Sequence, residues 1–224
     1  MIGDMSDQLE NVTIAILGGT GDQGNGLARR FALAGHRVLI GSRNAERAQA
    51  AAEALADAGR VEGGANADVA AEADLIIVAV PWDGHRALLT DLRETLTGKI
   101  VVDCVNPLGF DKQGAFALPV EEGSAAQQAA AVLPESRVVG AFHHVSAKLL
   151  LDPAVETIDL DVLVLGDDRE ATDLVQALAA RIPGVRGVYG GRLRNAHQVE
   201  AFTANLVSIN RRYKAHAGIR VTDV

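Results

Sequence analysis

VTIAILGGTGDQG, at residues 12–24, is the stretch from which the fold can be inferred. Its first six residues are apolar and partly β-branched, as in a buried strand. The glycines that follow fit the pattern Gly19-x-Gly21-x-x-Gly24, and apolar residues then recur at helical spacing. A glycine loop between a strand and a helix is typical of a βαβ unit that binds a dinucleotide, whereas the pattern alone arises by chance in glycine-rich chains.

Each glycine of this loop has its own expected task. Gly19 makes the tight turn, Gly21 lets the backbone approach a pyrophosphate, and Gly24 lets the helix pack on the strand. The N–H groups at the start of the helix then face the anion. The alternative interpretation is a structural turn of an α/β protein that binds nothing.

The alternation of strands and helices continues along the chain. Short apolar runs predict further strands at residues 37–40, 75–80, 99–102, 137–141, 161–165 and 185–189. Helical spacing predicts helices from the glycine loop to residue 35 and at residues 44–59, 83–96, 125–133, 168–181 and 195–217. We therefore expect an α/β fold with a doubly wound, mostly parallel Rossmann-type sheet. Residues 1–153 would form the Rossmann domain, and residues 154–224 a small C-terminal α/β subdomain.

The end of the second predicted strand indicates which dinucleotide would bind. Sites for NAD place a carboxylate about 20 residues beyond the glycines, to bind the ribose 2′-hydroxyl. Here Gly41, Ser42 and Arg43 stand at that place, 43 − 24 = 19 residues past Gly24. A guanidinium pairs with a 2′-phosphate, and Arg47 lies one helical turn further on. The sequence therefore predicts NADP(H), unless both arginines are ordinary solvated residues.

Composition excludes several classes of protein. The 224 residues include 21 Lys plus Arg and 29 Asp plus Glu, which gives a net charge of −8. An acidic chain is a poor partner for nucleic acid or for an anionic membrane surface. The start of the chain predicts no secretory signal, no apolar run is long enough to span a bilayer, and a single cysteine, Cys104, fits a reducing compartment. These observations predict a cytoplasmic protein with no membrane or nucleic-acid partner.

Other residues with useful chemistry follow the predicted strands. Val80-Pro81-Trp82, Asp103 to Pro107 with Val105, and His143 to Ala147 should all meet at the carboxyl edge of the sheet. The pair His143-His144 has three interpretations: a ring-binding role, a structural role, or a metal site, which the spacing of the other histidines does not favour. Cys104 is better explained as a buried, inert thiol than as a nucleophile.

No Ser-His-Asp, Lys-Tyr or carboxylate-pair constellation is evident, so no catalytic residue is assigned. Hydride transfer between two bound rings depends mainly on positioning and has no obligatory protein base. Oxidation of an alcohol, by contrast, needs a base for the hydroxyl proton. The sequence therefore favours an electron-carrying ring as the second substrate.

These motifs together resemble the NADPH-dependent F420 reductases, also called F420-dependent NADP oxidoreductases. The resemblance rests on residues 14–24, 41–43 and 80–82 and extends through residues 124–126, 138–147, 166–168 and 195–210. It implies reversible hydride transfer between NADP(H) and coenzyme F420, an 8-hydroxy-5-deazaflavin, in a cytoplasmic homodimer.

The resemblance also implies which residues touch each substrate. The residues that would bind the dinucleotide are Gly19, Thr20, Gly21, Asp22, Gln23, Gly24, Ser42, Arg43, Arg47, Val80, Pro81, Val105 and Ala147. Residues His143, Val145 and Ser146 would border the deazaflavin, although the family also has proline at the place of Ser146. The small C-terminal subdomain would help form the deazaflavin cleft and the dimer.

Three alternatives remain open on sequence grounds. A non-catalytic NADP(H)-sensing regulator would use the same glycine loop and also lack catalytic residues. NADPH-dependent ferric or flavin reductases share the loop, and pyrroline-carboxylate reductases have a longer helical dimer domain. Residues 181–224 carry eight basic and two acidic residues, which either reflects a solvated helix or attracts an anionic partner such as F420.

Overall fold

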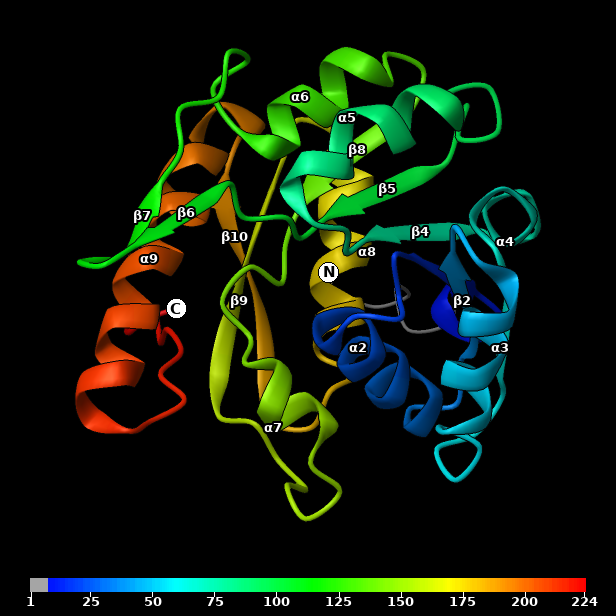
Figure 1. The fold of residues 1–224 in the computed structure, drawn as a ribbon, viewed down its shortest axis with the longest axis horizontal. Coiled ribbons are helices and arrows are strands. Elements are labelled where there is room, and N and C mark those ends of the chain that lie inside the picture. Colours follow the sequence, from blue (N-terminus) through cyan, green and yellow to red (C-terminus); the bar gives the residue numbers. More distant parts are fainter. Residues whose placement is uncertain (1–7) are drawn as a thin grey trace.

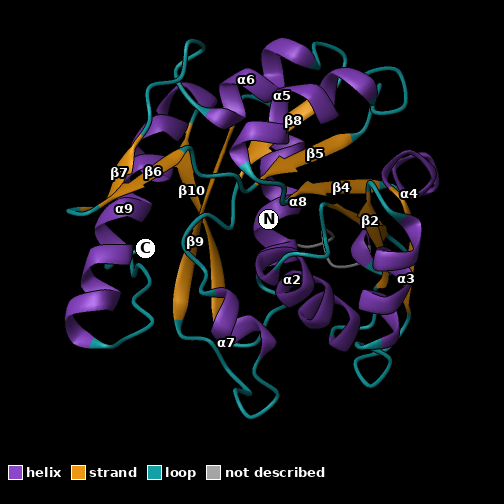
Figure 2. Cartoon of the chain, in the orientation of Figure 1, coloured by secondary structure: helices purple, strands orange, loops and turns teal. Residues whose placement is uncertain are grey.

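The computed structural model describes residues 8–224, and its centre is an eight-stranded sheet covered by helices on both faces (Figures 1 and 2). The strands are β1 Thr13–Leu17, β2 Arg37–Ser42, β3 Val61–Ala65, β4 Leu75–Val78, β5 Ile100–Asp103, β8 Arg137–Gly140, β9 Leu160–Gly166 and β10 Val185–Gly191. The helices are α2 Asp22–Leu33, α3 Ala45–Glu53, α4 Asn66–Glu72, α5 Trp82–Asp91, α6 Ala125–Val132, α7 Ala147–Leu151, α8 Arg169–Ala179 and α9 Ala196–Tyr213, with a 3₁₀ turn at Leu193–Asn195. A separate hairpin pairs β6 Leu108–Asp111 with β7 Gly114–Ala117.

The strand order is β10-β9-β8-β5-β4-β1-β2-β3. From β3 to β8 all neighbouring strands are parallel. The direction in which successive strands are added reverses between β1 and β4, and doubly wound sheets bind their ligands at such a point. Strand β9 is antiparallel to β8 and β10 is parallel to β9. The predicted Rossmann-type, mostly parallel sheet is confirmed, and the C-terminal region extends that same sheet.

Two apolar layers hold the helices on the sheet. Alternate residues of β1 face opposite sides: Ile14 and Ile16 join the cluster under α2, α3 and α8, while Ala15 and Leu17 join the cluster under α4, α5 and α6. Because both faces of each central strand are covered, these strands are apolar throughout. The alanine-rich helices contribute small side chains to both layers.

Several sequence predictions were wrong in detail. The strand β3 and the helix α4 were missed, because VEGGA is polar and glycine-rich and resembles a loop. Gly63 explains the composition: a Cβ there would lie 2.2 Å from the carbonyl of Ala48 in α3. The hairpin β6–β7 and the short α7 were also missed.

Predicted element ends were also too long in places. The helix predicted at 44–59 ends at Glu53, the one at 83–96 ends at Asp91, and the strand predicted at 75–80 ends at Val78. The last helix ends at Tyr213, where Lys214 adopts a left-handed conformation (φ 52°). By contrast, Asn44 caps α3 as predicted, with its side chain accepting from the backbone N–H of Arg47.

No helix within residues 8–224 is long and apolar enough to cross a membrane. Residues 1–7, which were predicted to carry no secretory signal, lie outside the described part of the chain.

Candidate functional site

The glycine loop leads from β1 into α2 and contacts the end of β2. The backbone N–H of Gly19 donates to the carbonyl of Gly41, at 3.0 Å, and to that of Ile16, at 3.2 Å. Gly18 has φ 71°, and a Cβ there would lie 2.5 Å from Val80 Cγ1 at the end of β4. These contacts hold the glycine loop close to the ends of β2 and β4.

The glycines of the motif differ in what requires them. A Cβ on Gly24 would lie 2.5 Å from the Cα of Gly19, so the packing of α2 against the loop itself requires a glycine. A Cβ on Gly21 would come no closer than 3.8 Å to a protein atom, and the backbone of Gly21 is extended (φ −84°, ψ 164°). Nothing in the protein requires glycine at position 21. The space beside it is the place where the backbone could approach a pyrophosphate.

Helix α2 offers an anion site directly after Gly21. No side chain caps its N-terminus, so the first N–H groups of the helix are not satisfied by a cap. Oriented N–H groups at the start of a helix stabilise a phosphate. Of the predicted neighbours, Thr20 and Gln23 are half-buried and Asp22 is exposed in the first turn.

Two exposed arginines stand at the end of β2. Ser42 is buried, and its Oγ accepts from the N–H of Asn44 at 3.2 Å. The side chains of Arg43 and Arg47 are exposed and form no ion pair or hydrogen bond with residues 8–224. Arg37, on the same strand, is instead held by Glu62 and Glu72. Arg43 and Arg47 are thus available for a phosphate, whereas Arg37 is not.

A buried polar cluster lies behind the ends of β4 and β5. Asp103 Oδ2 is 2.5 Å from His85 Nε2, and Gln128 Oε1 is 3.0 Å from His85 Nδ1. His85 and Asp103 are fully buried. Burial lowers the pKa of His85, but the charge of Asp103 and the hydrogen bonds to Asp103 and Gln128 raise it overall above its usual value. Val80 is half-buried and Pro81 is exposed at the start of α5.

Glu200 links the last helix to the Rossmann helices. Its carboxylate oxygens accept from the N–H groups of Ala125 (2.7 Å) and Ala126 (3.0 Å), at the start of α6. Glu200 is only 2 % exposed, and burial raises its pKa to about 8 although these two hydrogen bonds lower it. A carboxylate at a helix N-terminus offsets unsatisfied N–H groups and the helix dipole.

The loop of residues 141–147, here called the histidine loop, follows β8. Phe142 has φ 62°, a conformation that is uncommon for a bulky residue and is often found at functional sites. The carbonyl of Phe142 accepts from Gln23 Nε2 at 3.3 Å, and the carbonyl of His143 accepts from Asn106 Nδ2 at 3.2 Å. The loop is therefore tied to the glycine loop and to the end of β5.

The two histidines of this loop are buried and neutral at pH 7. Both ring nitrogens of His143 lack a hydrogen-bond partner among residues 8–224, and burial lowers the pKa of His143 to about 4. His144 Nε2 donates to the carbonyl of Val199 in α9 at 2.6 Å, and burial also lowers the pKa of His144. The ring of His144 packs edge-on against Phe202. Neither ring is available as an acid at neutral pH.

The remaining predicted residues of this region differ in exposure. Val105 and Val145 are 4 % exposed and belong to the two apolar layers, so they could offer a ligand only their backbone groups. Ser146 Oγ lies 3.4 Å from His216 Nδ1, and Ala147 begins α7. Arg30 fixes α7 by donating to the carbonyls of residues 149, 150 and 152.

Comparison with known proteins identifies the family. A family profile described as "NADP oxidoreductase coenzyme F420-dependent" matches residues 13–107. The F420-dependent NADP reductase of Methanothermobacter thermautotrophicus is 42 % identical over 221 residues, which cover 94 % of this chain and 95 % of that protein. The chain belongs to the F420-dependent NADP reductases.

Two further proteins are similar to this chain, one of them a solved structure and the other a much longer protein. The crystal structure of a candidate F420-dependent NADP reductase from an Arthrobacter species is 29 % identical, with a TM-score of 0.82, and covers 95 % of this chain and 100 % of its own. Metalloreductase STEAP3 of Rattus norvegicus is 31 % identical over 84 % of this chain but only 36 % of its own length. In STEAP3 the matching region is therefore one part of a much longer protein.

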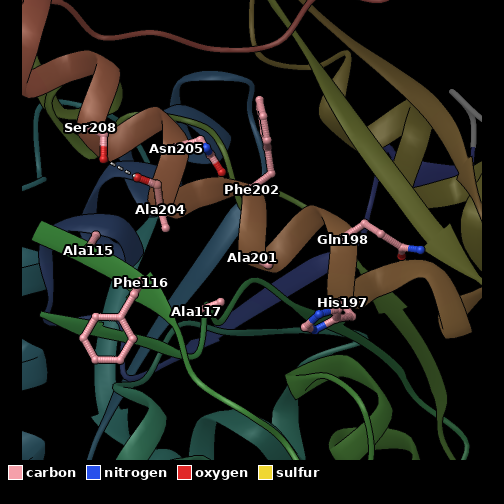
Figure 3. Close-up of a pocket in the computed structure, with 10 residues that line it drawn as sticks. All are labelled: Ala115, Phe116, Ala117, His197, Gln198, Ala201, Phe202, Ala204, Asn205 and Ser208. Carbon is pink, nitrogen blue, oxygen red and sulfur yellow. Dashed lines mark hydrogen bonds between the residues drawn. The ribbon is translucent and has the colours of Figure 1, made fainter.

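A groove of about 560 Å³ lies on another part of this family member, between β7 and α9 (Figure 3). Phe116 on the hairpin and Phe202 on α9 line it, and both are more than 40 % exposed. Phe202 also contacts His144, so the groove borders the histidine loop on its outer side. The sequence did not predict this groove, because the hairpin that forms one wall was missed.

Cys104 in this F420-dependent NADP reductase is buried, as predicted, and its thiol donates to the carbonyl of Val78 at 3.0 Å. Burial raises the pKa of the Cys104 thiol far above its usual value. No group of three or more His, Cys, Asp or Glu side chains is close enough together within residues 8–224 to hold a metal ion.

Sequence reasoning also missed functional candidates in this chain. His85, Gln128 and Glu200 are buried polar side chains that attach three helices to one another and to β5. The available signal was weak: Asp103 stands at the carboxyl end of a predicted strand, and Glu200 interrupts an otherwise apolar helix face. Nothing in the sequence shows that these residues meet.

Proposed function

We propose that this protein catalyses reversible hydride transfer between NADP(H) and coenzyme F420: NADPH reduces the oxidised deazaflavin, and the reduced deazaflavin reduces NADP⁺. The observation that supports it most is the 42 % identity to an F420-dependent NADP reductase over nearly the whole of both chains. The glycine loop with its open side at Gly21 fits the dinucleotide that this reaction needs.

The NADP(H) side of the proposed site is built from residues 19–24 and the end of β2. The N-terminus of α2 would hold the pyrophosphate, and Ser42, Arg43 and Arg47 would hold the 2′-phosphate. Support comes from the two unpaired guanidinium groups and from the absence of a carboxylate at the end of β2. Val80, Pro81, Val105 and Ala147 would complete the dinucleotide site.

The deazaflavin side of the proposed site is the histidine loop. His143, Val145 and Ser146 would border the ring, and no side chain would act as an obligatory acid or base. Support comes from the burial of His143, which keeps the imidazole neutral and leaves both ring nitrogens without a partner. Positioning of two rings in a water-poor cleft is the main contribution such a protein makes.

Mixing the protein with NADPH and oxidised F420 tests the proposal. The visible absorbance of the oxidised deazaflavin should fall with time, and NADP⁺ with reduced F420 should restore it. Bound NADPH without any loss of that absorbance would favour the NADP(H)-sensing regulator instead. Reduction of a ferric chelate or a flavin in place of F420 would favour the reductase alternatives.

The proposal includes a cytoplasmic homodimer with residues 154–224 contributing to its contact. The hairpin and α9 place large apolar side chains in solvent, which are Phe110, Phe116, Phe202, Ile209 and Tyr213. Contiguous exposed apolar surface marks an interaction site more often than an ordinary surface. Figure 1 shows the hairpin lying against α9 at one edge of the molecule.

Sedimentation tests the dimer directly. The wild-type protein should sediment as a dimer, and Phe116→Ser with Phe202→Ser should shift it to a monomer. The matched control is Leu33→Ser on α2, which removes a side chain that is also exposed, at 53 %, but away from the hairpin. A monomeric wild-type protein, or a dimer that survives the double substitution, would contradict this interface.

A further inference from the structure

The carboxylate of Asp103 makes two contacts in opposite directions. Its Oδ2 atom is 2.5 Å from His85 Nε2 in the buried cluster, and its Oδ1 atom accepts from the N–H of Val105 at 3.0 Å. The second contact folds the chain into a turn at the point where β5 ends. The side chain of Asp103 thus joins His85 on helix α5 to the loop at the carboxyl edge of the sheet.

The orientation of Gln128 determines the protonation of His85. Gln128 Nε2 donates to Glu122 Oε2 at 3.1 Å, and Glu122 is paired with Arg86, so Gln128 presents its oxygen to His85 Nδ1. Both nitrogens of the ring therefore face oxygen acceptors, which requires an N–H at each. His85 and Asp103 form a buried, hydrogen-bonded ion pair, the kind of group that holds one fixed geometry.

The loop that this pair holds is connected to the proposed cleft. Asn106 follows Val105 and donates to the carbonyl of His143 at 3.2 Å, while its own oxygen accepts from Thr203 Oγ1 at 3.1 Å. The end of β5 is therefore the junction of the histidine loop, the helix α9 and the buried cluster.

We infer that Asp103, anchored by His85, is a positioning residue that sets the residue 105–106 loop against the NADP(H) and deazaflavin sites. The inference rests on the proposed function for its kinetic part. Asp103 is fully buried, so it acts through the N–H of Val105 and through the neighbouring Asn106. A displacement of about 1 Å at such a point lowers the rate of a reaction that depends on positioning by about 100-fold.

The test compares two substitutions of one residue. Asp103→Ala removes both contacts, whereas Asp103→Asn can keep both, because its oxygen accepts from Val105 and its nitrogen donates to a neutral His85. We expect kcat to fall about 30- to 100-fold in Asp103→Ala and to stay within about threefold in Asp103→Asn. Both are measured at a temperature where circular dichroism shows the protein to be fully folded, so that lost stability does not reduce the measured rate.

A second readout does not depend on F420. Trp82 is the single tryptophan, and its ring centre lies 5.5 Å from that of His85. Quenching of its fluorescence by NADPH gives a dissociation constant, which should rise about tenfold in Asp103→Ala and little in Asp103→Asn. A wild-type protein that binds NADPH but does not reduce F420 would overturn the proposed function. The NADPH dissociation constants of the two variants would then decide the inference about Asp103.

The control is another buried carboxylate. Asp161 is fully buried, accepts from Arg186 and from the N–H of Val221, and lies on β9, which is separated from β5 by β8 in the sheet. Asp161→Ala should lose stability but keep NADPH affinity, because β9 contributes no residue to the proposed NADP(H) site. If Asp103→Ala does not fold, Asp103→Ser replaces it, since the hydroxyl can accept from Val105 but cannot reach His85, and kcat should fall about tenfold. Wild-type kcat and NADPH affinity in the folded Ala or Ser variant, or equal losses in Ala and Asn, would overturn the inference.

Discussion

The glycine-loop region, residues 17–47, and the histidine-loop region, residues 141–147 with α9, are built in opposite ways. The first presents backbone N–H groups and exposed guanidinium groups that form no ion pair with the described residues. In the second, residues 141–145 are buried, and the polar groups of the region bond to residues 37 to 119 positions away in the chain. The proposed phosphate site would thus use local backbone and exposed charge, whereas the proposed ring site would use long-range packing.

The two regions also differ in whether the residues proposed to bind a ligand are the residues that stabilise the fold. In the glycine-loop region, Gly24 is required by packing and Gly21 is not. In the histidine-loop region, the residues proposed to border the deazaflavin are themselves held by long-range contacts of the fold, as the bond from Asn106 to the carbonyl of His143 shows. Substitutions should therefore separate cofactor affinity from stability in the first region more cleanly than in the second.

The largest effect should come from the two glycines. Gly21→Ala places a methyl group in open space, so the free energy of unfolding should change by less than about 1 kcal/mol, while the NADPH dissociation constant rises on the order of 100-fold. Gly24→Ala should also cost about 1–3 kcal/mol of stability, because its Cβ meets the backbone of Gly19. Thermal unfolding and NADPH titration measure both quantities. Full NADPH affinity in Gly21→Ala would end the assignment of this loop as the pyrophosphate site.

A smaller effect is expected from the 2′-phosphate contact. Arg43→Ala should raise the KM for NADPH about 10- to 50-fold and leave the KM for NADH unchanged, because a charge-assisted hydrogen bond contributes about 1.5–3 kcal/mol. Arg93→Ala is the control, since Arg93 is also exposed but precedes β5 at the other edge of the sheet. Equal changes for both nucleotides would show that Arg43 does not distinguish them.

The effect expected from Glu200 is the smallest when it is compared over a single pH unit. Its pKa of about 8 in the folded protein lies above its value in the unfolded chain, because burial disfavours the charge. The folded state therefore keeps a proton that the unfolded state releases, and stability should fall as the pH rises from about 5 to 8, by about 1 kcal/mol per pH unit. In Glu200→Gln this contribution to the slope should vanish. Denaturant unfolding at a series of pH values measures it, and identical slopes would contradict the raised pKa.

The parts of the fold that were predicted correctly share a physical cause. Strands β1, β2 and β5 are apolar because both faces are covered, and Asn44 and Gly35 punctuate helices by local hydrogen bonding and a positive φ. These signals lie within a few residues of one another. Strand β3 and the hairpin gave no such signal, because their glycines and polar residues are explained only by neighbours such as Ala48 and Phe116.

The candidate site divides along the same line. The glycine loop, Ser42, Arg43 and Arg47 could be predicted because strand, turn and helix follow one another directly in the chain. The histidine loop could be located only as the end of a strand. Its links to Gln23, Asn106 and α9 could not be predicted, since they join residues that are distant in sequence.

Sequence reasoning predicted the mostly parallel sheet, which the structure confirms. It also predicted the dinucleotide loop and the 2′-phosphate contact, which stay predictions. Each depends on periodicity or on a motif of adjacent residues. Three features are visible only in the folded chain: β9 pairs antiparallel with β8, Asp103 pairs with His85, and Glu200 caps α6. Burial and pairing of charges are properties of the assembled core. They arise when distant segments exclude water together, and a linear sequence does not state which segments those are.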